Sequence, residues 1–232
     1  QEANRRFSFS AKQTMRLAQQ LYEGIELGEE GSVGLITYMR TDSLNLAEKF
    51  LDEVASYLKN NFESGYFRGK KYYKTKAKLA QEAHEAIRPT GVFREPEKIK
   101  NYLDKNQAKL YQLIWQRTVA AQMTDAFFDQ TALEIGAQKT PYIFLANGQI
   151  IKFLGFLKIY QTATSETILP QVKAGDDLLL LEIKNNQHFT QPPARYSEAG
   201  LIKKLEGYGI GRPSTYAPII STIQERGYIL KE

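Results

Sequence analysis

Tyr38 and Arg40 are the two residues of this 232-residue chain whose types and spacing best fit a chemical reaction. They lie in the segment 34–43, at the end of an apolar run that predicts a short strand. Because residues two apart on a strand share a face, we expect the Tyr38 hydroxyl and the Arg40 guanidinium to project side by side. A phenol ionises at about pH 10, and a guanidinium favours the phenolate while binding phosphate oxygens in bidentate fashion. The pair therefore suits phosphoryl transfer through a tyrosine nucleophile.

The spacing of Tyr38 and Arg40 does not establish this chemistry by itself. Tyrosine is a common strand residue, and arginine is most often found at the surface. A half-buried strand tyrosine followed by a surface arginine is therefore the alternative interpretation of the same pattern.

His84 is a second candidate, as one of only two histidines in the chain. It begins the string His-Glu-Ala-Ile-Arg that ends at Arg88. A zinc-protease helix needs a second histidine at position 88, so we do not expect a zinc site here. From the residue alone, a hydrogen-bonding role in a site and a capping or core role both stay open.

The glycine-rich segment 207–215 could bind a phosphate group. It lacks the Lys-Ser/Thr ending of a nucleotide-binding loop, so we expect no ATP site. A glycine-rich turn that leads into a helix, with Arg212 and Thr215 beside it, still suits a DNA backbone phosphate. The alternative is a simple connector between two helices.

The segment 66–78 interleaves aromatic residues with lysines and arginine. Surfaces that bind single strands combine stacking rings with cations in this way. Most such lysine runs are solvated loops, so we expect a secondary contact at most.

The composition sets broad limits on the protein. The chain carries a formal charge of +5 and a pI of about 9.1, which suits a polyanionic partner without defining a mechanism. It has no cysteine, which excludes thiolate metal sites and fits a reducing cytosol. We find no membrane-spanning apolar run and no signal peptide, so we expect a cytoplasmic protein.

Helices are expected over most of the region 1–124. Three capping boxes predict helix starts, at Ser10 with Gln13, at Asn45 with Glu48 and at Asp104 with Gln107. Apolar residues recur at helical spacing after each start and define the expected core stripes. The stripes are Thr14, Leu17, Ala18, Leu21 and Ile25; Leu46, Phe50, Leu51, Val54, Tyr57 and Leu58; and Leu110, Leu113, Ile114 and Trp115.

The pattern changes to strands over 125–194. The dipeptide Asn147-Gly148 between two apolar runs predicts a two-residue hairpin, and residues 178–183 predict a further strand after a turn at 174–177. Helices return in 195–232. Ser197 is expected to cap one that ends near Gly207, and Thr215 one that is closed by Gly227.

Three segments carry a resemblance to a known family. Residues 38–43 read Tyr-Met-Arg-Thr-Asp-Ser, residues 81–89 read Gln-Glu-Ala-His-Glu-Ala-Ile-Arg-Pro, and a third match runs from 192 through 216 to Tyr228. In this order and spacing they resemble the type IA DNA topoisomerases, and Met39 resembles the bacterial topoisomerase I branch. The resemblance covers essentially the whole chain.

The resemblance implies a fold and a set of site residues. The fold would be an α+β multidomain toroid, with a helical tyrosine-bearing domain at 1–124, half of a β-rich arch at 125–194 and a helical DNA-binding base at 195–232. Tyr38 would attack a DNA phosphate to form a 5′-phosphotyrosyl link, Arg40 would stabilise the developing charge and His84 would assist. The residues implied to contact DNA are Arg195, Arg212, Ser214 and Thr215.

The resemblance also implies partners and a cofactor. The partner would be DNA, either single-stranded or negatively supercoiled, the protein a monomer and its location the bacterial cytoplasm with the nucleoid. The family's Mg²⁺ ligands lie in a domain N-terminal to this segment, and ATP is not used. No Asp-x-Asp occurs here, and Asp176 and Asp177 are adjacent, so they point to opposite faces of a strand. Since the chain begins without methionine, we expect a central fragment that lacks the metal site and is inactive alone.

Three other classes of protein compete with this interpretation. The tyrosine recombinases place arginines and histidine before their tyrosine, whereas Tyr38 precedes both histidines, so the order disfavours them. A single-stranded DNA-binding module without catalytic activity and a segment of a reverse gyrase both stay open.

Overall fold

The N-terminal helices form where a side chain satisfies the first backbone amides. The computed structural model describes residues 1–73 and 84–230. Its first helices are α1 (Glu2–Phe7) and α2 (Ala11–Glu23), and Ser10 Oγ accepts a hydrogen bond from the amide of Gln13 at 3.1 Å. This confirms the predicted cap at Ser10, although Gln13 does not return a bond. The stripe of α2 is buried through Leu17, Ala18 and Leu21.

Helix α3 (Glu48–Asn61) begins differently from our prediction. Asn45 does not cap it; the N-cap residue is Ala47, whose amide donates to Glu85 Oε1 at 2.7 Å. The predicted cap was wrong because a carboxylate from a distant part of the chain reaches the helix end. The predicted stripe is confirmed, since the following residues are buried: Phe50, Leu51, Val54, Tyr57 and Leu58.

Helix α5 (Lys105–Gln122) is the central helix of the body, packing on α2, α3 and the short α4 (Pro96–Ile99). Its predicted capping box is confirmed in both directions, with Asp104 accepting from Gln107 N at 2.9 Å and Gln107 Oε1 accepting from Asp104 N at 3.0 Å. Trp115 Nε1 donates to the Val92 carbonyl at 2.8 Å. The helix is therefore held at its start by local bonds and along its length by burial.

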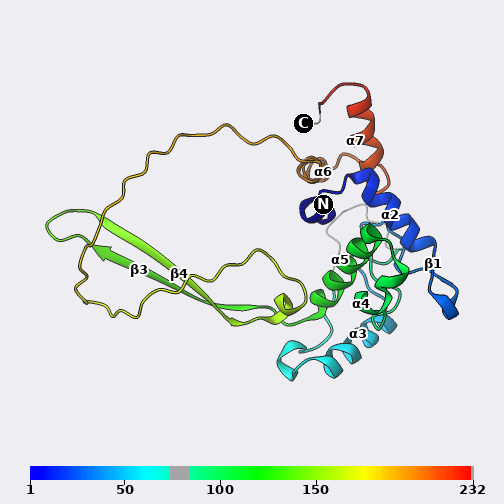
Figure 1. The fold of residues 1–232 in the computed structure, drawn as a ribbon, viewed down its shortest axis with the longest axis horizontal. Helices are drawn as coiled ribbons and strands as arrows, with labels where there is room; N and C mark the ends of the chain where they lie inside the picture. The colour runs from blue at the N-terminus through cyan, green and yellow to red at the C-terminus, as the bar shows by residue number, and fades with distance from the viewer. Residues whose placement is uncertain (74–83, 231–232) are drawn as a thin grey trace.

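Figure 1 shows a long hairpin that projects from this helical body. Its strands are β3 (Phe127–Gly136) and β4 (Ile143–Phe153), paired antiparallel. The predicted turn at Asn147-Gly148 is wrong, because both residues lie inside β4 and the turn is at 137–142. A Cβ on Gly148 would lie 2.7 Å from Leu169 Cγ and 3.0 Å from the Thr167 carbonyl oxygen. The glycine thus allows residues 167–169 to approach the strand.

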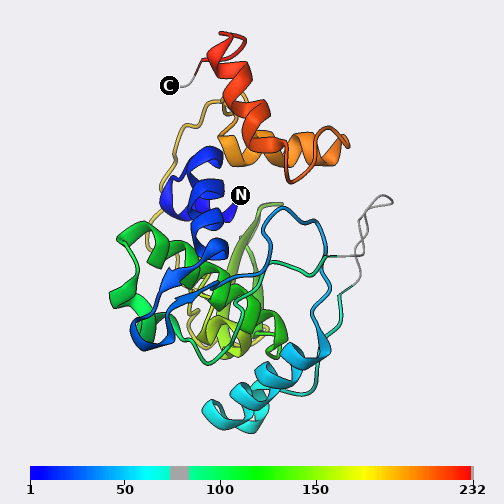
Figure 2. The same cartoon turned by 90° about the vertical axis from the view of Figure 1, so that its right-hand side faces the viewer.

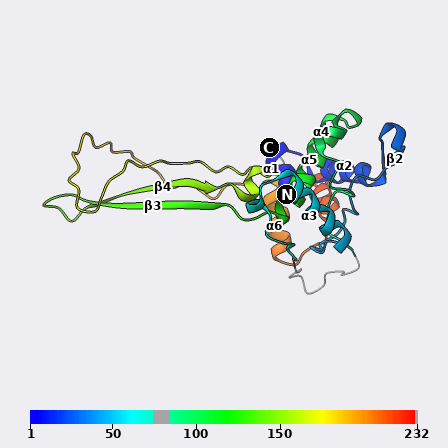
Figure 3. The same ribbon diagram turned by 90° about the horizontal axis from the view of Figure 1, so that it is seen from below.

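The predicted strand at 178–183 is also wrong. Residues 161–197 run out along the hairpin and return in an arc to α6 (Figures 1 and 3), and no strand is assigned at 178–183. Leu179 and Leu181 are 84% and 89% exposed. An apolar sequence favours an extended backbone, but a strand also requires hydrogen bonds to a neighbouring strand. No strand in the described residues supplies them.

The last two helices return to the start of the chain. They are α6 (Glu198–Gly207) and α7 (Tyr216–Glu225), which pack on α1 and α2 respectively (Figure 2). Ser197 Oγ accepts from Gly200 N at 3.1 Å, which confirms its predicted cap. Thr215 is the N-cap residue of α7 but makes no side-chain bond to it, so that part of the prediction was wrong.

The remaining short elements of the described residues connect these parts. They are two paired strands, β1 (Ile25–Glu26) and β2 (Ser32–Val33), and four 3₁₀ turns, η1 (Gly28–Glu30), η2 (Ser64–Tyr66), η3 (Lys100–Tyr102) and η4 (Gly155–Lys158). The whole is a mixed arrangement of helices and sheet, as the predicted α+β class requires. None of the helices in the described residues is long and apolar enough to cross a bilayer.

The starts of α5 and α3 provide a test of which side chains cap a helix. Asp104→Ala removes the acceptor of two amides, at Asn106 and Gln107, and should lower the free energy of unfolding by about 1 kcal/mol in urea denaturation. Asn45→Ala is the matched control, because Asn45 does not cap α3, and should change the free energy of unfolding by less than about 0.5 kcal/mol. Equal losses in the two variants would contradict this assignment.

Candidate active site

Tyr38 ends an extended segment that lies against α2. The Leu35 amide donates to the Leu21 carbonyl at 2.7 Å, and Ile36 forms an isolated bridge with Pro89. The predicted strand carrying Tyr38 was wrong, since the assigned strand ends at Val33. The segment is extended, but its pairing with residues 86–90 is too short and irregular to continue as a ladder. Tyr38 is half-buried.

Thr37 joins this segment to the one that carries His84. Its amide donates to the Arg88 carbonyl at 2.9 Å, and its hydroxyl donates to the Ala86 carbonyl at 2.7 Å while accepting from the Arg88 amide at 3.0 Å. The Thr90 amide donates to the Leu35 carbonyl at 3.0 Å. These bonds bring two regions that are far apart in sequence into one site.

Gly34 is needed where the segment passes α2. A Cβ at this position would lie 2.7 Å from the Tyr22 carbonyl oxygen, a backbone atom that cannot move without distorting the helix. The glycine therefore permits the close contact from which Tyr38 is presented.

The Tyr38 ring lies between two other rings. Tyr22 on α2 contacts it edge-on at 5.5 Å between centroids and 66° between planes. His84 lies at 5.5 Å with the planes 33° apart. The structure thus brings the predicted pair Tyr38 and His84 together. Tyr22 was missed, and the only signal for it in the sequence was an aromatic residue at the end of the α2 pattern.

Arg40 is exposed, and Met39 between it and Tyr38 is buried. No hydrogen bond joins the Tyr38 hydroxyl to the Arg40 guanidinium in the described residues. The guanidinium also forms no ion pair with a carboxylate there, so within this part of the chain it is not neutralised by the protein. Its predicted action on a phosphate stays a prediction.

The turn after Arg40 is held by one local hydrogen bond and by one bond from a remote segment. The Ser43 amide donates to Thr41 Oγ1 at 3.0 Å, and the Ala86 amide donates to the Asn45 carbonyl at 2.7 Å. Burial raises the pKa of Tyr216, and the carboxylates of Glu206 and Asp42 raise it further, against the effect of Arg212. The Asp42 carboxylate, in the motif that begins at Tyr38, is thus one of the charges that act on Tyr216 at the start of α7.

The segment 207–215 forms a compact turn before α7. The Arg212 amide donates to Thr215 Oγ1 at 2.8 Å, and the Arg212 side chain donates to the Gly211 carbonyl at 3.1 Å. Arg212, Ser214 and Thr215 are exposed, as is Arg195 in the preceding coil. Among the described residues none of these four is bonded to Tyr38, Arg40 or His84, so their DNA contacts stay predictions.

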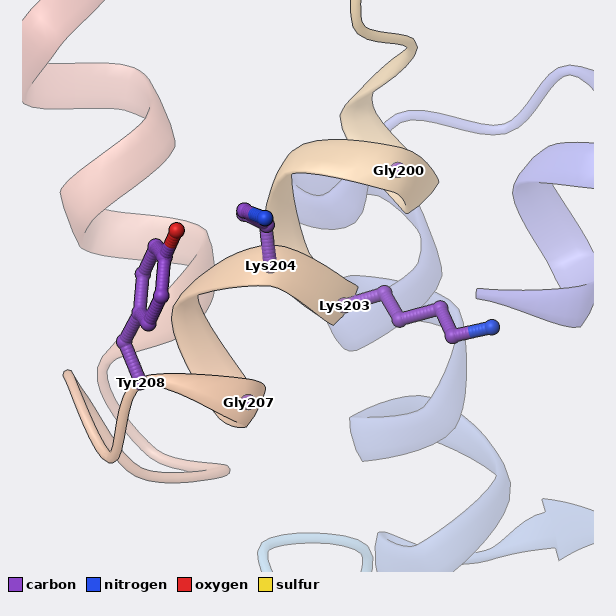
Figure 4. A pocket seen from close by; sticks show the side chains of 5 residues that line it. All are labelled: Gly200, Lys203, Lys204, Gly207 and Tyr208. Atoms are coloured by element: carbon purple, nitrogen blue, oxygen red, sulfur yellow. The ribbon is translucent and has the colours of Figure 1, made fainter.

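A shallow pocket lies beside this turn on α6. It has a volume of about 340 Å³ and is lined by Gly200, Lys203, Lys204, Gly207 and Tyr208. Figure 4 shows Lys203 pointing away from the side where Lys204 and Tyr208 lie together, and Lys204 Nζ is 4.9 Å from the Tyr208 ring centroid. Sequence reasoning missed this pair, which the i,i+4 spacing on a helix could have indicated.

Two cations of the segment 66–78, Lys70 and Lys71, are paired with carboxylates. Lys70 contacts the carboxylates of Glu48 and Asp52, and Lys71 Nζ lies 2.8 Å from Asp125 Oδ1. This favours a structural role for these two lysines over a DNA contact. Residues 74–78 of the predicted stacking surface, and residues 81–83 of the second motif, lie outside the described residues.

Acidic side chains do not form a cation site in the described part of the chain. No group of three histidines, aspartates or glutamates comes together there. Asp176 instead accepts from the Lys173 amide in a turn, at 2.7 Å. These residues do not fit a magnesium site, and we derive no step through a metal.

Comparisons with known proteins identify the class of this fold and site. Residues 1–232 match the family model described as DNA topoisomerase. The chain is 45% identical over 239 residues to DNA topoisomerase 1 of Rickettsia typhi, covering 100% of the chain and 31% of that protein. With its counterpart in Xylella fastidiosa (strain Temecula1) it shares 46% identity over 99% of the chain and 29% of that protein.

A solved structure agrees with these relatives. The full-length topoisomerase I from Thermotoga maritima superposes with a TM-score of 0.82 at 34% identity, over 100% of this chain and 37% of that one. The chain belongs to the DNA topoisomerase family. Its relatives are the bacterial type IA enzymes named DNA topoisomerase 1, which confirms the resemblance inferred from the motifs, and it spans about 31% of the length of the first of them.

The bonds made by Thr37 can be tested by substitution. Thr37→Val keeps the shape of the side chain but leaves the Ala86 carbonyl and the Arg88 amide without their partner, which should cost about 2 kcal/mol in free energy of unfolding. Thr140→Val is the control, because its hydroxyl bonds lie in the exposed hairpin turn, and it should cost less than about 0.5 kcal/mol. A Thr37→Val variant as stable as the control would show that the hydrogen bonds of the Thr37 hydroxyl do not hold the two segments together.

Proposed function

We propose that the protein containing this chain relaxes negatively supercoiled DNA by cutting one strand, passing another through the break and resealing it. The observation that carries the proposal is the placement of Tyr38, half-buried between the rings of Tyr22 and His84 and followed by Arg40, which is exposed and has no ion pair within the described residues. A tyrosine held by its ring has few rotamers to lose, so its hydroxyl is presented in a defined direction.

The covalent step exchanges one ester for another. Tyr38 Oη loses its proton and attacks a backbone phosphorus, the P–O3′ bond breaks, and the 3′ oxygen leaves as a hydroxyl after taking up a proton. The product is a 5′-phosphotyrosyl link with a free 3′-hydroxyl. Because a phosphodiester replaces a phosphodiester, the reverse reaction can reseal the strand without ATP.

Arg40 and His84 are the groups we assign to the phosphate. The Arg40 guanidinium would bind the phosphate oxygens and stabilise the charge that develops on them. His84, in ring contact with Tyr38, would donate a hydrogen bond to the same region. Both residues would make these contacts only when a DNA strand is bound.

The turn before α7 would hold the strand itself. Arg212, Ser214 and Thr215 are exposed there, and the coil before α6 carries the exposed Arg195. Contacts of this type bind the DNA backbone and fix its position without reading the base sequence. We propose that they bind single-stranded DNA in preference to a duplex.

The organisation of the whole protein follows from the same proposal. The segments 1–124, 125–194 and 195–232 would be the tyrosine-bearing domain, half of an arch and part of the base of a toroid. Mg²⁺ would be held by residues outside this chain and supply charge stabilisation at the phosphate when bound. The protein would act as a monomer in the bacterial cytoplasm, associated with the nucleoid.

A covalent adduct is the direct test. The natural full-length protein, given Mg²⁺ and a single-stranded oligonucleotide, should retain a radioactive label placed at the 3′ end of the oligonucleotide and not one at the 5′ end, because a 5′-phosphotyrosyl link holds the downstream piece. Tyr38→Phe should abolish the adduct. Tyr142→Phe, on a tyrosine exposed beside the hairpin turn, should leave it unchanged.

The 232-residue chain alone should form no adduct in the same assay, because its described residues offer no metal site. In that case it would act as a binding module only. Adduct formation by this chain would contradict the metal argument, and retention of the 5′ label by the full-length protein would contradict the proposed polarity.

The salt dependence of DNA binding tests Arg212. Arg212→Ala in the natural full-length protein, without divalent metal, should make the negative slope of log K against log salt shallower by about 0.7 for a single strand, the value expected for one lost phosphate contact. Arg226→Ala, at the opposite end of α7, should leave the slope unchanged. Equal slopes for the two variants would remove Arg212 from the DNA interface.

A further inference from the structure

Glu85 links two parts of the candidate site through one carboxylate. Its Oε1 accepts the amide of Ala47, the N-cap residue of α3, at 2.7 Å, and its Oε2 accepts from Arg88 Nη2 at 2.5 Å. The side chain is 31% exposed. Because the helix start carries a partial positive charge and Arg88 a full one, the carboxylate is stabilised from both sides.

Arg88 is itself held in place by the protein. Its Nη1 donates to the Pro89 carbonyl at 2.9 Å, and its guanidinium lies 4.2 Å from the centroid of the buried Phe50 ring. The Arg88 side chain is only 12% exposed. A guanidinium stacked on a ring and used by two acceptors is not available to a DNA phosphate, so Arg88 acts as the fixed partner of Glu85.

The N-terminus of α3 is already bound by the Glu85 carboxylate. The helix N-terminus close to Tyr38 in sequence is a potential phosphate site, but the Glu85 carboxylate takes the first amide that such a phosphate would use. This end of α3 therefore has an internal anion, and its effect is to hold the segment that contains Glu85.

His84 directly precedes Glu85, so its position depends on this anchor. On the other side of Glu85, the Ala86 amide donates to the Asn45 carbonyl at 2.7 Å and the Ala86 carbonyl accepts from the Thr37 hydroxyl at 2.7 Å. The backbone that follows Glu85 is thus tied to the Tyr38 segment and to the residues before α3. The His84 ring leaves this anchored stretch and meets the Tyr38 ring at 5.5 Å.

We propose that Glu85 is a positioning residue that holds His84 against Tyr38 and so sets the geometry from which the tyrosine attacks. The inference rests on the proposed function of Tyr38 but concerns a residue that does not touch the DNA. It predicts a defect in the chemical step and not in DNA binding.

The kinetic test uses single-turnover cleavage by the natural full-length protein at saturating oligonucleotide. Glu85→Ala removes both bonds and should slow adduct formation by about 100-fold, the scale of a misplacement of about 1 Å, with oligonucleotide affinity changed less than about twofold. Glu85→Gln keeps an oxygen for the Ala47 amide but loses the charge, and should slow the step by only about tenfold.

Glu95→Gln is the matched control for these variants. Glu95 pairs with Lys98 at the same i,i+3 spacing, at 2.7 Å, and its side chain is 30% exposed, so it matches Glu85 in exposure and in the spacing of its cation. Its cleavage rate should equal that of the unmodified protein. A rate for Glu85→Ala within about twofold of this control, or a loss explained entirely by weaker binding, would overturn the proposal.

A spectroscopic measurement tests positioning separately from activity. His84 and His188 are the only histidines of the 232-residue chain, so labelled imidazole signals can be assigned by removing His188. Nuclear Overhauser cross-peaks between the His84 and Tyr38 rings should be present in the unmodified chain and in Glu95→Gln, weaker in Glu85→Gln and absent in Glu85→Ala.

The two measurements distinguish the two hypotheses. If the unmodified full-length protein forms no adduct, the proposed function fails, while the cross-peaks still decide whether Glu85 positions His84. If the adduct forms but Glu85→Gln retains both its full cleavage rate and full cross-peaks, the positioning role is wrong. Glu85→Gln also keeps the test valid if Glu85→Ala does not fold.

Discussion

The contact between residues 34–37 and 86–90 is the constraint on which the candidate site depends. Thr37 supplies most of it, through its amide and its hydroxyl, and Gly34 lets the same segment lie directly on α2. Because both partners are irregular segments, neither would keep its conformation without the other. The nucleophile candidate and its neighbouring histidine therefore share one support, and a change in that support moves both.

Around this contact the molecule divides into a packed body and an extended arm. Helices α2, α3 and α5 bury the apolar stripes and leave the rings of Tyr22, Tyr38 and His84 at the edge of the core. The hairpin and the coil that follows it carry exposed apolar residues instead, among them Leu179 and Leu181. For the proposed function, the packed body would supply the rigid site that strand cleavage needs.

The sequence predicted best those features that need only neighbouring residues. The caps at Ser10, Asp104 and Ser197 were found because each bond spans three residues or fewer, and the helical stripes because burial follows a fixed period. The wrong predictions concern features whose position is set by residues distant in sequence. Glu85, and not Asn45, accepts an amide at the start of α3. Asn147 and Gly148 do not form the hairpin turn, because the register of β3 and β4 places both inside a strand.

By itself the sequence determined which residues can carry the chemistry and to which family the chain belongs, because side-chain types and their order in motifs are properties of the chain alone. Only the tertiary structure decided which of them meet. Tyr38 reaches His84 and Tyr22 through hydrogen bonds between remote segments, and Arg88 is directed to Glu85 and Phe50 instead of to solvent. Such contacts depend on packing across the whole body, so local spacing carries no information about them.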